Sequence, residues 1–125
     1  YKHNQFPFFY SRDSGYTTDW VAKDVNEIAD VFAYKQDMNL DGGILVGVPL
    51  PTESALSEEV TRAAITKALA RVAKEKITGK SVTPALLKVI SEETKGQSLT
   101  ANIALIKNNA NLGARLAVAL AQKFE

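Results

Sequence analysis

Cysteine is absent from the 125 residues, and histidine occurs once, as His3. The absence of cysteine excludes a disulfide scaffold, a zinc site built on thiolates and a cysteine nucleophile. A single histidine argues against a His-rich metal site and against a Ser–His relay. No apolar run approaches the roughly 18 residues that a membrane-spanning helix needs. These absences remove several classes of enzyme without indicating another.

An excess of one charge is also missing, because 15 Lys and Arg residues face 14 Asp and Glu residues, for a net charge of +1. So neutral a chain has no overall field that would draw in nucleic acid or an anionic membrane. Its composition is globular, with 46% hydrophobic and 23% charged residues, and its length is that of one domain or a piece of one. The first residues lack an initiator Met and a hydrophobic signal core. We therefore expect a cleaved or truncated start and a cytoplasmic location, with an organelle as the alternative.

A few short strands are predicted. Residues 6–10 form an apolar run interrupted by Pro7, which is typical of an edge strand or an extended segment. Residues 16–21 have β-type composition. Residues 44–48 are a continuous apolar run between glycines and a proline, the pattern of a strand buried on both faces of a parallel sheet. Because such a sheet needs several strands with both faces covered, we expect more chain upstream.

About four helices are predicted from capping residues and apolar periodicity. The first has the capping box of Asp24 and Glu27, and the third has the Thr-Pro pair of a helix start. Their predicted spans, each beginning with its capping residue, are Asp24 to about Met38, Ser57 to about Lys76, Thr83 to about Gly96, and Ser98 to about Lys123.

The last helix carries the sharpest local signal. With successive residues about 100° apart around its axis, Asn102 and Asn109 lie near the centre of a broad apolar arc. The arc consists of Leu99, Ile103, Ile106, Ala110, Leu112, Leu116, Ala117 and Leu120. A buried amide left unpaired costs about 1–3 kcal/mol. Either these amides pair with the backbone or with each other, or Asn102 faces a polar cavity and binds the edge of a heterocycle with its donor and acceptor.

A second polar stretch, from Ser11 to Gly15, also has two interpretations. Its hydroxyls, the Arg12 guanidinium and the turn amides are suited to a phosphate. Without further information an ordinary polar turn, with a local pair between Arg12 and Asp13, is the favoured interpretation. His3 is interpreted as a surface residue, and no pair of catalytic carboxylates is indicated.

Four stretches, in order and covering essentially the whole chain, resemble one family. They are residues 6–15 (F-P-x-F-[YF]-S-R-x-S-G), residues 41–46 with the following P-x-P at 49–51 (G-G-[AV]-L-V), residues 77–87 (G-K-x-x-T-P-F-L-L) and residues 98–110 (S-L-x-[AS]-N-I-x-L-V-x-N-N-A). The family is pseudouridine-5′-phosphate glycosidase, also called the indigoidine synthase A-like family.

The resemblance implies a three-layer α/β/α enzyme with a mixed sheet, usually a homotrimer, that uses Mn²⁺. Such an enzyme, a glycosidase or lyase of pseudouridine degradation, reversibly cleaves the C–C glycosidic bond of pseudouridine 5′-phosphate to uracil and ribose 5-phosphate. A lysine forms a Schiff base with C1 of the sugar and opens the ring, which is covalent amine catalysis. A carboxylate is expected to protonate the uracil carbon.

Placed on this family, residues 1–125 resemble the C-terminal segment of a single domain whose N-terminal part is absent. The resemblance puts the nucleophilic lysine, the acid and the Mn²⁺ ligands upstream, so that this segment alone is expected to be inactive. It implies that Asn102 contacts uracil and that Asn109 has a structural role near the site. Ser11 and Arg12 match the S-R of the family and are further candidates for substrate binding.

Several positions depart from the family's pattern, and alternatives stay open. The family commonly has Asn at the position of Val48, acidic residues at Asn4 and Gln5, and Phe at Ala85, so specificity or activity can differ. A kinase domain can follow in some members. The alternatives are a non-catalytic α/β module of the same ancestry, for oligomerisation or ligand binding, and another enzyme that acts on a sugar phosphate.

Overall fold

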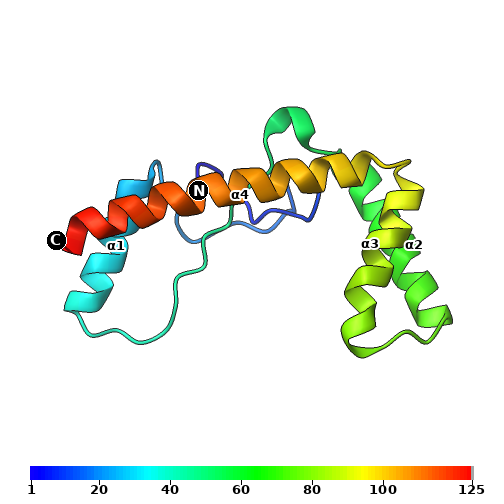
Figure 1. Ribbon diagram of the computed structural model, residues 1–125, viewed down its shortest axis with the longest axis horizontal. Coiled ribbons are helices and arrows are strands. Elements are labelled where there is room, and N and C mark those ends of the chain that lie inside the picture. Colours follow the sequence, from blue (N-terminus) through cyan, green and yellow to red (C-terminus); the bar gives the residue numbers. More distant parts are fainter. Residues whose placement is uncertain (125) are drawn as a thin grey trace.

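The computed structural model describes residues 1–124, which form four α-helices and two short 3₁₀ helices joined by extended loops (Figure 1). In chain order the elements are α1 (Val25–Asp37), η1 (Thr52–Ser54), α2 (Glu58–Lys74), η2 (Gly79–Ser81), α3 (Val82–Glu93) and α4 (Gln97–Phe124). Across residues 1–124, no helix combines the length and the apolar character that crossing a membrane requires.

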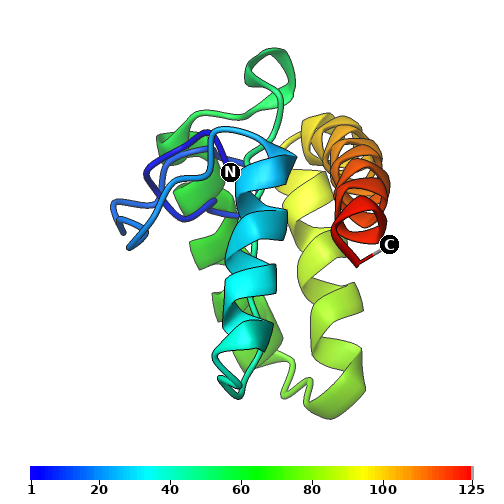
Figure 2. The ribbon, with the colours of Figure 1, turned by 90° about the vertical axis from the view of Figure 1, so that its left-hand side faces the viewer.

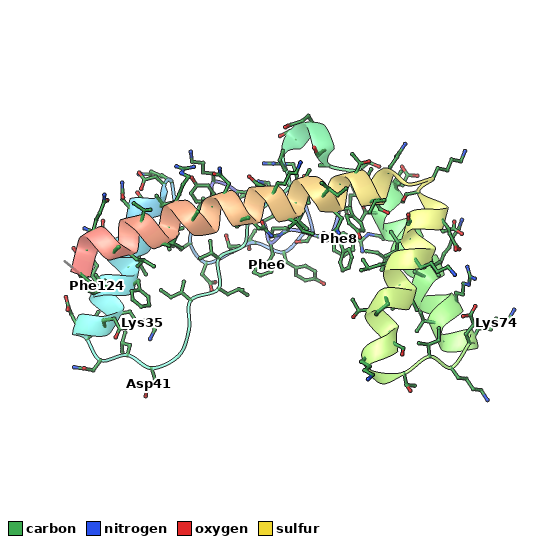
Figure 3. The ribbon with its side chains drawn as sticks, in the orientation of Figure 1. Phe6, Phe8, Lys35, Asp41, Lys74 and Phe124 are labelled. Carbon is green, nitrogen blue, oxygen red and sulfur yellow. The ribbon has the colours of Figure 1, made fainter. Side chains whose placement is uncertain are left out.

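The long helix α4 joins two separate ends of the molecule. Figure 1 shows α1 beside its C-terminal half and the α2/α3 hairpin below its N-terminal end, and Figure 2 shows both projecting from the same side of α4. Figure 3 places Phe6 and Phe8 of the N-terminal segment beneath the middle of α4, between those two ends. The helix α4 thus contacts both α1 at one end and α3 at the other, and connects the two ends of the molecule.

Each end has its own core. The α2/α3 cluster has at its centre the buried residues Tyr10, Leu50, Ala64, Ala68, Val89, Ile90 and Ala101. The α1 cluster has at its centre Val25, Ala29, Leu112 and Ala119, with partly buried residues such as Val46 and Leu116 packed against it. Both clusters take residues from α4, and the small residues Ala101 and Ala119 allow its partners to approach closely.

Two of the predicted helix starts are confirmed. Asp24 accepts hydrogen bonds from the backbone N–H groups of Asn26 and Glu27, at 2.8 and 3.0 Å. Glu27 reaches back to accept from the backbone N–H of Lys23 at 2.8 Å, as the capping box predicts. Ser57 caps α2 by accepting from the backbone N–H of Val60 at 3.3 Å.

The other two predicted caps are wrong. The third helix begins at Val82, directly after the 3₁₀ turn η2, so Thr83 and Pro84 lie inside its first turn. Pro84 is tolerated there because the first backbone N–H groups of a helix have no intrahelical acceptor. The last helix begins at Gln97 rather than after Ser98.

Thr94 provides the side-chain hydrogen bond at the start of α4 that was predicted for Ser98. Its hydroxyl donates to the carbonyl oxygen of Ile90 at 2.8 Å and accepts from the backbone N–H of Ser98 at 3.1 Å. Thr94 is 5% exposed and directly follows α3. One buried hydroxyl therefore ties the end of α3 to the start of α4.

The predicted strands exist as extended segments without a sheet. Within residues 1–124, antiparallel pairing is limited to isolated bridges between Gln5 and Thr17 and between Phe8 and Ser11. Residues 44–48 are extended but pair with no strand in the described chain. A strand is stabilised by hydrogen bonds to a neighbouring strand. Because residues 44–48 have no such neighbour among residues 1–124, they form an extended segment instead of a strand.

Charged pairs support both ends. Lys67 of α2 contacts Glu93 at 2.6 Å, and Arg71 contacts Glu92 at 2.8 Å and Glu75 at 2.9 Å. Hydrogen bonds to Glu75 and Glu92 raise the pKa of the Arg71 guanidinium above its usual value. At the other end Lys123 of α4 pairs with Asp30 of α1, which raises the pKa of this lysine.

Candidate functional site

Asn102 lies at the edge of the covered side of α4. Its neighbours Ser98 and Ala101 are buried at 2% and 1% exposure, whereas Ile103 and Ile106 are 47% and 59% exposed. Asn102 itself is half-buried, and within residues 1–124 its amide makes no hydrogen bond. The predicted apolar arc is therefore covered along one half only, and Asn102 lies where the covered half meets the open half.

Asn109, two turns further along, lies at a similar boundary. It is exposed and lines a pocket of about 260 Å³ between α4 and the extended segment, together with Val46, Val48 and Leu116. Apart from Asn109, the wall of this pocket is apolar at Val46, Val48 and Leu116. Asn109 makes no hydrogen bond within the described residues.

Its neighbour Asn108 has the contact that sequence reasoning missed. The Asn108 side chain donates from Nδ2 to the carbonyl oxygen of Pro49 at 3.1 Å, across 59 residues of sequence. On the helical wheel Asn108 is close to Ala101 and Ala119, which are buried, and that position was the available signal. This amide fixes the middle of α4 to the segment that follows the extended run.

Ser11 and Arg12 have structural contacts. Ser11 is 3% exposed, and its hydroxyl exchanges 3.3 Å hydrogen bonds with the backbone of Asp13. The half-buried Arg12 donates through its guanidinium to the carbonyl oxygen of Leu50. Two consecutive carbonyls are thus held from different parts of the chain: Asn108 of α4 donates to Pro49, and Arg12 of the N-terminal segment donates to Leu50.

The predicted pair between Arg12 and Asp13 is wrong. The carboxylate of Asp13 instead contacts His3, with Oδ1 lying 2.9 Å from the ring nitrogen Nε2. The side chain of His3 is 18% exposed, so it is more enclosed than a surface residue. Arg12 is drawn away because the buried carbonyl of Leu50 needs a donor.

Of the four candidates, Arg12 alone is hydrogen-bonded to Leu50, which is fully buried. Tyr10 and Ala101, which precede Ser11 and Asn102 in the sequence, share the α2/α3 cluster with Leu50. Burial raises the pKa of the Tyr10 phenol, so this hydroxyl stays protonated near neutral pH. The neighbourhood can donate and accept hydrogen bonds but holds no poised acid or base.

The described residues gather no cluster of metal ligands. Among residues 1–124, no group of three or more His, Cys, Asp or Glu side chains could hold a metal ion, so Mn²⁺ does not fit residues 1–124 by themselves. A nucleophilic lysine is activated by desolvation or by a neighbouring cation. Every lysine in the chain is exposed except Lys35, which is half-buried and donates to the carbonyl oxygen of Leu40.

A family of known proteins matches this sequence and this arrangement of helices. The sequence model described as indigoidine synthase A like protein matches residues 1–119. The chain belongs to the indigoidine synthase A-like family. The motifs at residues 6–15 and 98–110, on which the resemblance rested, fall within the matched range.

Curated relatives of this family carry a specific name. The pseudouridine-5′-phosphate glycosidase of Alkaliphilus metalliredigens is 44% identical over 120 residues, which are 96% of this chain and 39% of that protein. The protein of the same name from Cupriavidus pinatubonensis is 45% identical over 121 residues, or 97% and 38%. The chain therefore spans about two fifths of the length of these relatives.

Solved structures confirm the fold class as part of an α/β fold. An indigoidine synthase A-like protein from Thermotoga maritima superposes with a TM-score of 0.82 and 32% identity, covering 96% of this chain and 39% of that one. A prealnumycin C-glycosynthase, solved in complex with ribulose 5-phosphate, superposes with a TM-score of 0.79 at 24% identity, covering 100% and 42%. The second likeness concerns the fold alone.

Proposed function

We propose that this chain is the C-terminal portion of a pseudouridine-5′-phosphate glycosidase and that Asn102 binds the uracil of its substrate. The observation that carries the proposal is the 44% identity to a glycosidase of that name over 96% of the chain. The position of Asn102 supports it, because a half-buried amide without an internal partner is available to a ligand. The enzyme would act in the cytoplasm as a homotrimer.

The proposed reaction reversibly cleaves the C–C bond between C1 of the sugar and the uracil carbon. A lysine in the part of the enzyme outside this chain adds through its amine to C1 and displaces the ring oxygen, which opens the ring. The C–C bond then breaks as the nitrogen lone pair forms the Schiff base with C1; the bonding electrons pass to uracil, and a carboxylate of that same part protonates the uracil carbon. Water hydrolyses the Schiff base, which releases ribose 5-phosphate and restores the lysine. No step is assigned to Mn²⁺, because the residues described here do not form a site for it.

Asn102 would orient the base during this step. Its amide N–H donates to a carbonyl oxygen of uracil, and its amide oxygen accepts from a ring N–H. Asn109 would line the neighbouring pocket with Val46 and Val48. Arg12 would act indirectly, since its hydrogen bond holds the carbonyl of Leu50 in the segment on which this part of the site rests. Ser11 would act through the turn at Asp13, to whose backbone its hydroxyl is hydrogen-bonded.

Replacing Asn102 with Ala tests this role in a chimera in which residues 1–125 replace the matching part of the Alkaliphilus glycosidase. Loss of two hydrogen bonds to the base is expected to lower kcat/KM for uracil release by about 30- to 150-fold, at about 1–1.5 kcal/mol each. Asn111→Ala, at an exposed position of the same helix, is the matched control and should leave kcat/KM unchanged. Equal kcat/KM values for the two variants would show that Asn102 does not bind the base.

The chain alone is expected to be inactive, because the proposal assigns the nucleophilic lysine to the part of the enzyme outside this chain. Borohydride reduction in the presence of ribose 5-phosphate should trap no sugar on residues 1–125, and it should trap one in the chimera. Peptide mass spectrometry locates the modified residue. A stable adduct on a lysine of residues 1–125 in the chimera would contradict the assignment of the nucleophile to the other part.

A further inference from the structure

The chain exposes more surface than a compact protein of its size. Its accessible surface is 8471 Å², whereas a folded monomer of 13.6 kDa has about 6,600 Å². The excess of about 1,900 Å² is of the size that one partner contributes to an obligate interface, roughly 1,000–2,500 Å². The area therefore indicates a large covering partner rather than a transient contact.

One continuous apolar face accounts for much of what is open on α4. We call it the outer stripe, and its residues follow one another at alternating steps of four and three. They are Leu99, Ile103, Ile106, Ala110, Gly113 and Ala117. All six are exposed, and the first three are 57%, 47% and 59% exposed. This spacing is that of a seam which packs along another element.

The middle of the outer stripe consists of small residues. A Cβ added at Gly113 would meet no atom within 4 Å, and Gly113 borders the pocket that α4 shares with Val46 and Val48. Ala110 and Ala117, both exposed, flank it one turn away on either side. Small side chains at these positions would let a partner backbone come close.

The outer stripe adjoins the candidate site. On the helical wheel Asn102 and Asn109 lie between the outer stripe and the covered face, which includes Leu112 and Leu116. A partner seated on the outer stripe would therefore pass beside both amides. Val46 and Val48 of the extended run pack against the α1 cluster, but Leu45 is 82% exposed and residues 44–48 have no strand partner within residues 1–124. The run is therefore a second feature that a neighbouring strand could pair with.

The relatives indicate the occupant. This chain covers 39% of the Alkaliphilus glycosidase and 39% of the solved Thermotoga protein, onto which it superposes with a TM-score of 0.82. About 60% of the length of each relative is therefore not matched by this chain. We call this remainder of the Alkaliphilus glycosidase the complementary part.

We propose that the outer stripe of α4 is the docking surface for the complementary part of the glycosidase, and that docking encloses Asn102 at its edge. The inference rests on the proposed function only in taking the rest of that enzyme as the partner. A second copy of this chain is the competing occupant, and the experiment separates the two.

The natural lack of cysteine allows the outer stripe to be probed without background in this chain. Ile106→Cys places a thiol on the outer stripe, and Asn111→Cys places one at an exposed position on another face of the same helix. Each variant is prepared as the free chain and in the chimera with the complementary part. Maleimide labelling rates are then measured by peptide mass spectrometry.

In the free chain both thiols should react at similar rates. In the chimera the thiol at position 106 should react at least tenfold more slowly, while that at position 111 keeps its rate. Equal rates at position 106 in both forms would overturn the proposal. Protection at position 106 in the free chain, rising with its concentration, would assign the outer stripe to a second copy and would equally overturn it.

A binding measurement keeps the proposal testable if the chimera does not fold. The chain is co-expressed with the tagged complementary part, and recovery of a 1:1 complex is expected. Ile103→Glu with Ile106→Glu should abolish recovery, and Asn111→Glu should not. No complex in either format would overturn the proposal. A protected, well-formed complex that releases no uracil would instead refute the proposed function and leave the docking surface standing.

Discussion

The two ends of the molecule, on either end of α4, bury their apolar side chains to different degrees. At the α2/α3 end a helical hairpin closes over Leu50, Ile90 and Ala101, and ion pairs such as Lys67 to Glu93 bridge its two helices. At the α1 end one helix packs on α4, and the chain then continues through Met38, Leu40 and Leu45, which are 62%, 56% and 82% exposed. Elements that bury their apolar faces locally are complete in this chain, and those that need distant partners are open.

The largest expected effect lies in the completed end. Ile90→Ala removes a side chain that is 1% exposed from the α2/α3 cluster. The lost burial and the cavity should lower the free energy of unfolding by about 2–5 kcal/mol. The control, Leu45→Ala in the open end, should change it by less than about 0.5 kcal/mol. Urea unfolding measures both, and similar losses for the two variants would erase the contrast between the ends.

A smaller effect is expected at the joint between the hairpin and α4. Thr94→Val keeps the shape of the side chain but removes the donor to Ile90 and the acceptor for the backbone N–H of Ser98. The carbonyl of Ile90 still accepts from the backbone N–H of residue 94, but the buried N–H of Ser98 loses its acceptor, which should cost about 1–3 kcal/mol of unfolding free energy. Thr100→Val, at an exposed position of α4, is the matched variant. A loss no larger than that of Thr100→Val would show that the hydroxyl does not join the two helices.

The smallest effect is expected at the open end. Asp24→Ala removes the cap that accepts from Asn26 and Glu27, and should cost about 1 kcal/mol. Hydrogen exchange should show faster exchange in α1 while α2 and α3 keep their protection, since the two clusters are separate. Asp41→Ala, in the exposed loop after α1, serves as the control. Loss of protection in α2 and α3 as well would mean that the two ends unfold together.

Local signals in the sequence predicted local structure well. The capping box at Asp24 and Glu27 and the cap at Ser57 form as predicted, because their hydrogen bonds span three or four residues. The predicted start of the third helix, at Thr83, is wrong. The 3₁₀ turn at Gly79–Ser81 leads directly into α3 without a side-chain cap, so no capping residue marks the true start.

Features that depend on distant contacts were not predictable from a single sequence. The hydrogen bond from Arg12 to Leu50 spans 38 residues, and that from Asn108 to Pro49 spans 59. The run at 44–48 has the composition of a buried strand but finds no neighbouring strand in the described chain. The arc on α4 was correctly seen as apolar, but only tertiary structure shows that the half containing Leu99 and Ile106 is left open.

Uracil release from pseudouridine 5′-phosphate tests the central claim most directly. Residues 1–125 are assayed alone, and then in the chimera with the complementary part of the Alkaliphilus glycosidase. We predict no uracil from the chain alone and steady release from the chimera, because the proposed nucleophile belongs to the complementary part and Asn102 to this chain. A folded chimera that releases no uracil, or a chain that releases uracil by itself, would contradict this account.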